Sequence, residues 1–469
     1  MSETLSRDTL DASATDLVAA LAARRVSALE LADAAIARIE ARDPAINAVV
    51  VRDFDRAREA ARDADVALAR GERRPLLGLP MTVKESHNVA GLPTTWGFEP
   101  FKDFRAPEDS IAVGRLKAAG AVILGKTNIP PFLADWQSAN PVYGRTNNPY
   151  DLTRTPGGSS GGGAAALAAG MVPLEFGSDI GGSIRVPAAF CGVYGHKPSF
   201  DLVPSRGHQP PYADGVPPPL AVVGPLARTA ADLTLALHVV AGPDLPQSKA
   251  YRLALPAARH ARLADFRVLV IDQHPVAAVD AEIRAALATL AGKLEIMGVQ
   301  IGRESDLMPD LTKAQETYAG LLGVAMSRGG PEPSTASANA WLTMLDAQAA
   351  ARRQWSALFE AFDVVLAPVF GQVAFPHAQA LEGQARTLDI DGQPTPYFAQ
   401  LAWPGMATLA NLPATAIPIG RTRAGLPIGA QIIGPFLEDR TTLAFAEHLE
   451  REFGGFQPPS SSEQATLSN

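Results

Sequence analysis

Two glycine-rich turns, joined by a short alanine-rich segment, constrain this chain more than any other feature of its sequence. The stretch runs from Arg154 to Arg185 and reads RTPGGSSGGGAAALAAGMVPLEFGSDIGGSIR. Glycine lets the backbone approach another group closely and lets amide N–H groups point at a ligand. The stretch holds four serines: Ser159, Ser160, Ser178 and Ser183. We therefore expect the two turns to form one pocket with acyl-transfer chemistry.

The composition narrows the class of protein. Of 469 residues, 47% are hydrophobic and 19% charged, which is typical of a soluble globular protein with a large core. A net charge of −8 without clustered Lys and Arg argues against a nucleic-acid partner. The single cysteine, Cys191, excludes an internal disulfide and a multi-cysteine metal site. Since no His, Asp or Glu cluster has metal-ligand spacing either, we expect no metal and no other cofactor.

Neither export nor membrane insertion is expected. The N-terminus lacks the basic start and the apolar core of a secretory signal. The most apolar run, residues 164–174, is broken by Gly170 and Pro173, and it is shorter than the roughly 20 residues that span a bilayer. We expect a cytoplasmic protein with no membrane partner.

Short apolar runs alternate with stretches of helical spacing, which predicts an α/β protein with a covered sheet. Ser27 and Glu30 form a capping box for a helix that we expect Pro44 to end. Residues 329–333 are expected to break the chain between two late helices. The expected helices cover residues 14–24, 27–42, 54–70, 110–119, 281–297, 312–326 and 338–362, and residues 128–136 are expected to form a turn that leads into a further helix. The expected strands lie in residues 47–51, 75–86, 121–124, 266–271 and 364–370.

Lys84 lies on an otherwise apolar strand, where Thr82 shares its face. One interpretation is a lysine at a strand end that reaches solvent or pairs with Glu85. The other is a desolvated lysine whose lowered pKa lets it act as a base.

Three general motifs overlap this region. Residues 158–162, centred on Ser160, match the G-x-S-x-G nucleophile elbow of α/β-hydrolases, although no predicted strand leads into them. Residues 161–166 fit a loose dinucleotide-binding pattern, but the strand that must precede this pattern is not predicted there either. Residues 120–127 match the P-loop pattern, but their apolar centre predicts a strand, so we take the match as accidental.

The second turn, residues 177–183, has the makings of an oxyanion hole. The backbone N–H groups of Ile180, Gly181 and Gly182 are able to converge on one oxygen. The Asp179 carboxylate is able to hold the loop by accepting hydrogen bonds from the backbone amides of the loop. The alternative is a β-turn with a helix-capping serine. The first turn and Lys84 together favour the catalytic interpretation.

With these residues in place, the chain resembles the amidase signature family. The resemblance covers about residues 75–205, and residues 413–414 and 425–429 are similar to the family's late strands. The motifs that carry it are Val83-Lys84, Gly157–Gly162, Gly177–Arg185 and Pro187–Gly192. It implies a large mixed twisted central sheet covered by helices on both faces. It also implies one catalytic domain over residues 1–456, and we expect a flexible tail over residues 457–469.

The resemblance further implies an amide-bond hydrolase with a Ser-cisSer-Lys triad and an acyl-enzyme intermediate. Ser183 corresponds to the nucleophile, Ser159 to the bridging serine after a cis peptide bond, and Lys84 to the base. The N–H groups of residues 180–183 correspond to the oxyanion hole. The supporting residues are Ser160, Asp179 and Arg185. The expected partner is a small-molecule amide, with esters and carbamates as further substrates, and a homodimer is left open.

The resemblance implies that loops outside the signature build most of the acyl pocket, so substrate choice is expected to reside in aromatic side chains, each of which is equally suited to the core. The candidates are Phe132, Trp136, Tyr143, Tyr212, Tyr318 and Trp341. They favour an aryl or apolar amide.

Three alternatives remain. One is the amidase subunit of a tRNA-dependent glutamine amidotransferase, although Ile180 stands where that subgroup typically carries threonine. A serine esterase of α/β-hydrolase type is another, and it requires one of the eight histidines as base. A dinucleotide-binding oxidoreductase is the third.

Overall fold

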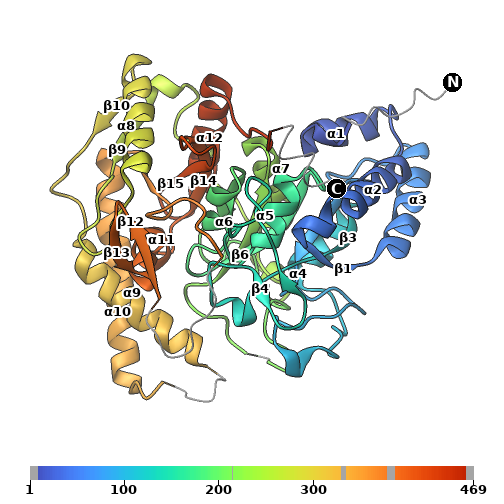
Figure 1. Ribbon diagram of the computed structural model, residues 1–469, viewed down its shortest axis with the longest axis horizontal. Coiled ribbons are helices and arrows are strands. Elements are labelled where there is room, and N and C mark those ends of the chain that lie inside the picture. Colours follow the sequence, from blue (N-terminus) through green and yellow to red (C-terminus); the bar gives the residue numbers. More distant parts are fainter. Residues whose placement is uncertain (1–8, 214, 329–333, 378–385, 461–469) are drawn as a thin grey trace.

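An eleven-stranded mixed sheet runs through the whole protein, with β1 at one edge and β10 at the other (Figure 1). The computed structural model describes residues 9–213, 215–328, 334–377 and 386–460. The strand order is β1-β3-β2-β6-β8-β7-β14-β15-β11-β9-β10. The blue N-terminal elements and the yellow to orange elements therefore lie at opposite ends of Figure 1, with the green segment between them.

The strands of this sheet are β1 (Val49–Arg52), β2 (Pro80–Lys84), β3 (Val122–Thr127), β6 (Leu174–Asp179), β7 (Tyr194–Lys197), β8 (Val222–Ala227), β9 (Arg267–Val270), β10 (Gln300–Gly302), β11 (Val364–Pro368), β14 (Ala414–Arg421) and β15 (Pro427–Ile433). Strand β2 pairs in parallel with β3 and β6, and β9 pairs in parallel with β10 and β11. The remaining neighbours are antiparallel. Two short hairpins, β4 (Ala139–Asn140) with β5 (Gly144–Arg145) and β12 (Thr387–Ile390) with β13 (Gln393–Pro396), lie outside it.

Helices cover both faces of the sheet, which confirms the fold class expected from the sequence. The helices are α1 (Ala14–Ala22), α2 (Ala28–Ile46), α3 (Phe54–Ala69), α4 (Ile111–Ala118), α5 (Gly161–Ala168), α6 (Arg185–Phe190), α7 (Ala230–Val240), α8 (Ala281–Ile296), α9 (Leu311–Ser327), α10 (Ala338–Ala361), α11 (Ala402–Leu409) and α12 (Asp439–Phe453). Helices α5 and α6 pack together on one face, and α7 packs with α4 and α12 on the other.

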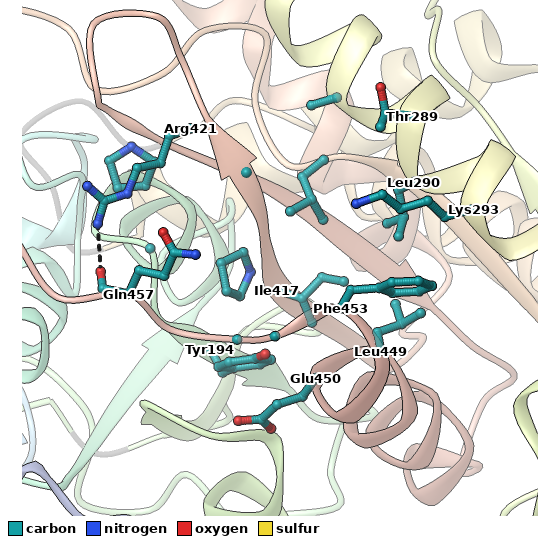
Figure 2. Close-up of a pocket in the computed structure, with 18 of the residues that line it drawn as sticks. Tyr194, Thr289, Leu290, Lys293, Ile417, Arg421, Leu449, Glu450, Phe453 and Gln457 are labelled. Carbon is teal, nitrogen blue, oxygen red and sulfur yellow. Dashed lines mark hydrogen bonds between the residues drawn. The ribbon is translucent and has the colours of Figure 1, made fainter.

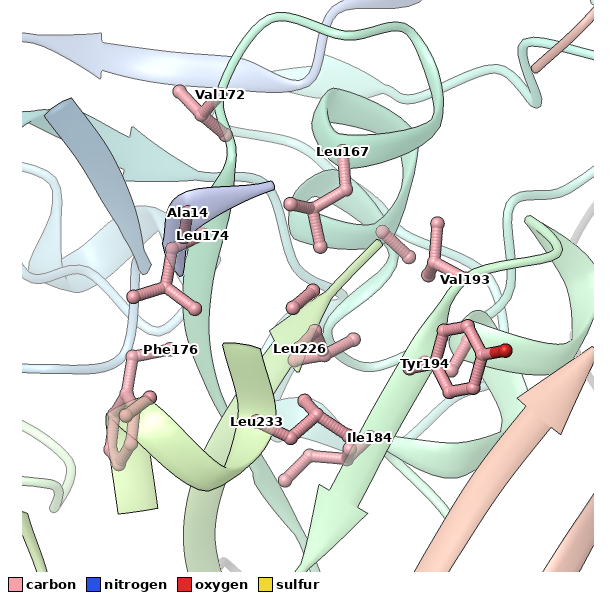
Figure 3. Close-up of a cluster of buried hydrophobic side chains, with 14 of the residues drawn as sticks. Ala14, Leu167, Val172, Leu174, Phe176, Ile184, Val193, Tyr194, Leu226 and Leu233 are labelled. Atoms are coloured by element: carbon pink, nitrogen blue, oxygen red, sulfur yellow. The ribbon is translucent and has the colours of Figure 1, made fainter. Parts of the chain in front are cut away.

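The central strand β6 is buried on both of its faces. Leu174 and Phe176 of β6 pack with Leu226 of β8 and Leu233 of α7, as Figure 3 shows. These side chains are fully buried. A strand covered on both faces has no solvent side, so the polar residues of β6, such as Glu175, are buried together with its apolar ones.

The start of α2 is as predicted, but its end is not. Ser27 accepts from the Glu30 N–H at 3.1 Å and the Glu30 carboxylate accepts from the Ser27 N–H at 2.9 Å, which completes the capping box. The prediction that Pro44 ends the helix is wrong, since Pro44 lies inside it. The helix ends instead at Asn47, which adopts the left-handed conformation with φ of 59° that commonly terminates helices.

The further helix expected at residues 128–136 is also absent from the described structure. Only a short 3-10 turn, η3 (Pro131–Leu133), forms there, and Phe132 and Leu133 have φ of 50° and 61°. The adjacent prolines, Pro130 and Pro131, each remove a backbone donor, and the left-handed residues that follow are incompatible with an α-helix.

Two sequence predictions fall partly or wholly outside the described residues. The breaker at 329–333 lies outside them, as do residues 461–469 of the expected tail. Within the described part, the Gln457 carbonyl accepts from the Tyr150 hydroxyl at 2.5 Å and from Arg421 at 3.0 Å.

Candidate active site

Lys84 ends strand β2 in the interior of the protein. Its side chain is fully buried, so it does not reach solvent. The Nζ atom donates to Ser159 Oγ at 2.7 Å, to Ser178 Oγ at 2.9 Å and to the Ser178 carbonyl at 3.4 Å. Glu85 instead accepts from the N–H groups of Thr95 and Trp96. The strand therefore aims the lysine at the two serine turns.

The first serine turn approaches Lys84 through a cis peptide bond between Gly158 and Ser159. Glycine is required at position 158, because a Cβ there would lie 2.4 Å from the Asp135 carbonyl oxygen. The next residue, Ser160, joins the two turns: its N–H donates to the Ser183 carbonyl at 3.1 Å, and its hydroxyl donates to the Ser178 carbonyl at 3.3 Å. Helix α5 follows directly, and a loop rather than a strand precedes the turn. The nucleophile elbow and the dinucleotide motif both need a strand there.

The second serine turn begins where β6 ends at Asp179. The Asp179 carboxylate accepts from the N–H groups of Gly182 at 2.9 Å and Ile184 at 3.1 Å. It also forms a fully buried ion pair with Arg185, whose NH2 group lies 2.9 Å away. Arg185 in turn donates to Gln431 Oε1 at 2.7 Å, to the Pro404 carbonyl and to Thr408. The turn that carries Ser183 is thereby anchored to the C-terminal half of the chain.

Burial sets the charges of this cluster. Desolvation lowers the pKa of Lys84 to about 7, against the opposing attraction of Asp179 and Glu175. Although burial alone would raise it, the pKa of Asp179 falls to about 2 because Arg185 pairs with it. Burial raises the pKa of Glu175, which lies against Gly163 of α5. The lysine amine is thus available in its neutral form near pH 7, beside a carboxylate that stays charged.

A cavity of about 270 Å³ opens onto the serines. Ser159, Ser178, Ile180 and Ser183 line one side of it. Most of the remaining wall is apolar: Trp96, Phe132, Leu133, Pro210, Ala213, Val216, Pro218, Ala221, Val222, Ala325 and Met326. His208, Gln209 and Arg328 add polar groups. No local signal in the sequence points to the contribution of α9, because residues 325 and 326 lie far from the serine turns along the chain.

Of the six aromatic residues predicted to line the pocket, the structure places Phe132 at this cavity. The Trp136 Nε1–H group donates to the Gly181 carbonyl at 2.9 Å, and the Tyr318 hydroxyl donates to the Ile180 carbonyl at 2.8 Å. Tyr143 donates to Glu85. Tyr212 is 84% exposed and packs edge-on against Phe104. Trp341 packs on a small buried cluster around Leu321.

The four backbone N–H groups predicted for the oxyanion hole are not equivalent. Gly182 donates its N–H to Asp179. Those of Ile180, Gly181 and Ser183 make no hydrogen bond with any residue that the structure describes. Unengaged N–H groups beside a candidate nucleophile are what an oxyanion hole requires.

A second cavity, of about 450 Å³, lies elsewhere in the fold, between α8, α12 and β14 (Figure 2). Tyr194, Lys293, Arg421, Glu450 and Phe453 line it, and the four serines of the glycine-rich turns do not. Arg421 there donates to the Gln457 carbonyl, the bond dashed in Figure 2. This cavity is therefore separate from the candidate active site.

Three further observations concern the histidines, metal binding and membrane insertion. His196 is fully buried and bonds Thr415 and Asp439, and His208 bonds Ser86 at 2.8 Å. Over the described ranges, the side chains of His, Cys, Asp and Glu form no group of three or more that is able to hold a metal ion. None of the described helices is both long and apolar enough to traverse a lipid bilayer.

Comparison with known proteins points to one family. A family model described as Amidase matches residues 30–328 and 311–443. A glutamyl-tRNA(Gln) amidotransferase subunit from Anaeromyxobacter sp. (strain K) is 35% identical, over 94% of this chain and 96% of its own length. Fatty-acid amide hydrolase 2-A of Danio rerio is 32% identical, over 95% of this chain and 90% of its own length. Among solved structures, a bacterial aryl acylamidase of the amidase signature enzymes family has a TM-score of 0.83 at 26% identity and covers 98% of both chains.

Proposed function

This chain belongs to the amidase signature family and is an amidase-type hydrolase of C–N bonds, and we propose that Ser183 is its nucleophile, Ser159 its proton relay and Lys84 its base. The observation that carries the proposal is the 2.7 Å contact between Lys84 Nζ and Ser159 Oγ, at the wall of a cavity that Ser183 also lines. A serine hydroxyl is a weak nucleophile until a base takes its proton, and a lysine whose pKa is about 7 is able to serve as that base.

Acylation then proceeds in two steps. Ser183 Oγ attacks the amide carbonyl carbon while its proton passes to Ser159 Oγ, and the Ser159 proton passes to the neutral Lys84 amine. The N–H groups of Ile180, Gly181 and Ser183 stabilise the oxyanion. When the C–N bond breaks, Lys84 returns a proton through Ser159 to the leaving amine, and an acyl ester remains on Ser183.

Deacylation repeats the same relay with water. A water molecule attacks the ester carbonyl as its proton passes through Ser159 to Lys84. The ester C–O bond then breaks, the proton returns to Ser183 Oγ, and the free acid leaves. The fully buried ion pair of Asp179 with Arg185 keeps the second serine turn in place during both acylation and deacylation.

The cavity wall supports an aryl or apolar acyl or amine group in the substrate. Trp96, Phe132 and Met326 line it, and apolar walls of this kind gain free energy by removing apolar ligand surface from water. A panel of aryl, aliphatic and carbamate substrates tests this point, with aryl and long-chain amides expected to have higher kcat/KM than acetamide. The opposite order would rule out an apolar substrate class.

A fluorophosphonate reagent tests the triad directly. We expect peptide mapping to find the adduct on Ser183 and to find no adduct in Lys84→Ala. An adduct on Ser160 in place of Ser183 would instead support the esterase alternative with its nucleophile elbow. Undiminished turnover of Ser183→Ala would refute the assignment of the nucleophile.

A second candidate function is that of an amidotransferase subunit, because the 35% identical relative carries that name. The two functions differ in their partners. The purified chain alone is expected to hydrolyse amides if it is a free hydrolase. If it is a subunit, it is expected to be inactive alone and to release ammonia from glutamine only with partner proteins. Size-exclusion chromatography of the active chain also tests for a homodimer.

A further inference from the structure

Two buried side chains hold the backbone of the second serine turn from behind. The Tyr318 hydroxyl donates to the Ile180 carbonyl at 2.8 Å, and Trp136 Nε1–H donates to the Gly181 carbonyl at 2.9 Å. These carbonyls belong to consecutive peptide units, which join residues 180 to 181 and 181 to 182. Each side chain therefore fixes the orientation of one peptide unit beside the proposed nucleophile.

The direction of each N–H group follows from that of its carbonyl. Both peptide units are trans, since the single cis bond of the described chain is Gly158–Ser159. In a planar trans unit, the C=O and N–H bonds point in opposite directions. The unit 181–182 is held at both ends, by Trp136 and by Asp179, which accepts the Gly182 N–H at 2.9 Å. The unit 180–181 is held by Tyr318 at its carbonyl, while the Gly181 N–H makes no hydrogen bond with the described residues.

Tyr318 is well placed to hold this orientation rigidly. It is fully buried on α9, in a cluster with Leu220, Leu321 and Leu409. A Cβ on Gly405 would come within 2.7 Å of the Tyr318 ring, so the ring packs tightly against the backbone at Gly405. Burial and the nearby charge of Asp179 raise the pKa of Tyr318, so that its hydroxyl remains a donor at physiological pH.

We propose that Tyr318 is a positioning residue, which aims the Gly181 N–H at the oxyanion that forms when Ser183 attacks the substrate. This inference rests on the proposed function. A hydrogen bond to the Ile180 carbonyl also polarises the peptide unit and strengthens the N–H donor at its other end. The donor is thereby oriented before charge develops, which is the arrangement that lowers the barrier most effectively.

Tyr318→Phe removes the hydroxyl and keeps the ring, so it isolates the proposed effect. We expect kcat to fall roughly tenfold, the consequence of weakening one neutral hydrogen bond, with KM unchanged because the oxyanion exists only in the transition state. An aryl boronic acid, which forms a tetrahedral adduct with serine, is expected to lose affinity by the same factor. The affinity of the product carboxylic acid is expected to remain unchanged.

Tyr150→Phe is the matched control. Tyr150 is also buried and donates its hydroxyl to a backbone carbonyl, that of Gln457, but it lines the second cavity. It is expected to leave kcat and boronic acid affinity unchanged. The proposal is overturned if Tyr318→Phe keeps kcat within twofold of wild type, or if it weakens product binding as much as boronic acid binding. Failure of the proposed function is a separate result, seen as the absence of a Ser183 adduct in the wild-type protein.

Discussion

Replacement of Lys84 by methionine is expected to abolish turnover and yet to stabilise the fold at neutral pH. Burial lowers the pKa of this lysine from 10.5 to about 7. Between those two values the unfolded chain binds more protons at this position than the folded one, so linkage makes stability rise with pH across that window. Burial of Lys84 therefore lowers the free energy of unfolding of the wild-type protein most at and below pH 7.

The magnitude follows from the shift. At about 1.4 kcal/mol per pKa unit, the free energy cost of neutralising Lys84 is about 4 kcal/mol at pH 7 and about 1 kcal/mol at pH 9.5. Methionine also loses the hydrogen bonds to Ser159 and Ser178, which are worth about 1 kcal/mol each. We expect Lys84→Met to exceed wild type in free energy of unfolding by about 2 kcal/mol at pH 7, and to lose that advantage at pH 9.5.

Urea unfolding at the two pH values measures this difference. Lys197→Met is the matched control, because Lys197 is also fully buried, has its pKa lowered by burial to about 7, and donates to the carbonyls of Pro198 and Leu412. It is expected to show the same trend with pH and to keep its turnover. A Lys84→Met protein that is less stable than wild type at pH 7, or whose stability difference does not change with pH, would refute the reasoning that Lys84 is neutral.

Two further outcomes follow from the site. The kcat/KM is expected to fall about tenfold per pH unit below about pH 7, as Lys84 takes up a proton, and a profile that is flat between pH 5 and 8 would contradict a lysine base. Asp179→Asn leaves the buried Arg185 without its counter-charge, so we expect the free energy of unfolding to fall by roughly 3–5 kcal/mol and Ser183 labelling to slow at least tenfold. Thermal melts and labelling kinetics measure both effects, and labelling at the wild-type rate would show that Asp179 does not hold the turn.

Local signals made parts of the fold predictable. The capping box of Ser27 and Glu30 marks the start of α2, and short apolar runs mark β3 and β11. Pro44 misled the prediction because the helix continues to Ile46 although Pro44 removes one backbone donor, and Asn47 sets the actual end. At residues 128–136, apolar spacing suggested a helix that the proline pair and the left-handed residues after it prevent.

Some residues of the candidate site were likewise predictable from the sequence, and others were not. Glycine turns are local in sequence, so the sequence was enough to single out Ser159 and Ser183 as candidates, and the apolar strand around Lys84 singled out the lysine. Residues that act from behind the turn have no such pattern. Tyr318 and Trp136 were expected at the pocket wall because they are aromatic, but their polar atoms bond backbone carbonyls of the turn. Packing between segments that are distant in sequence decides on which side of a loop a buried aromatic residue lies. The periodicity of the sequence does not reveal this side.

The contacts of Arg185 also bear on how the molecule is made. Its guanidinium reaches Pro404, Thr408 and Gln431, while β14 and β15 fill the sheet between β7 and β11. During synthesis, the ribosome completes both serine turns more than two hundred residues before it delivers these anchors. A nascent or prematurely terminated chain thus holds the three proposed catalytic side chains but lacks the contacts of Arg185 with Pro404, Thr408 and Gln431, so we expect catalytic activity only after the last strands have been made.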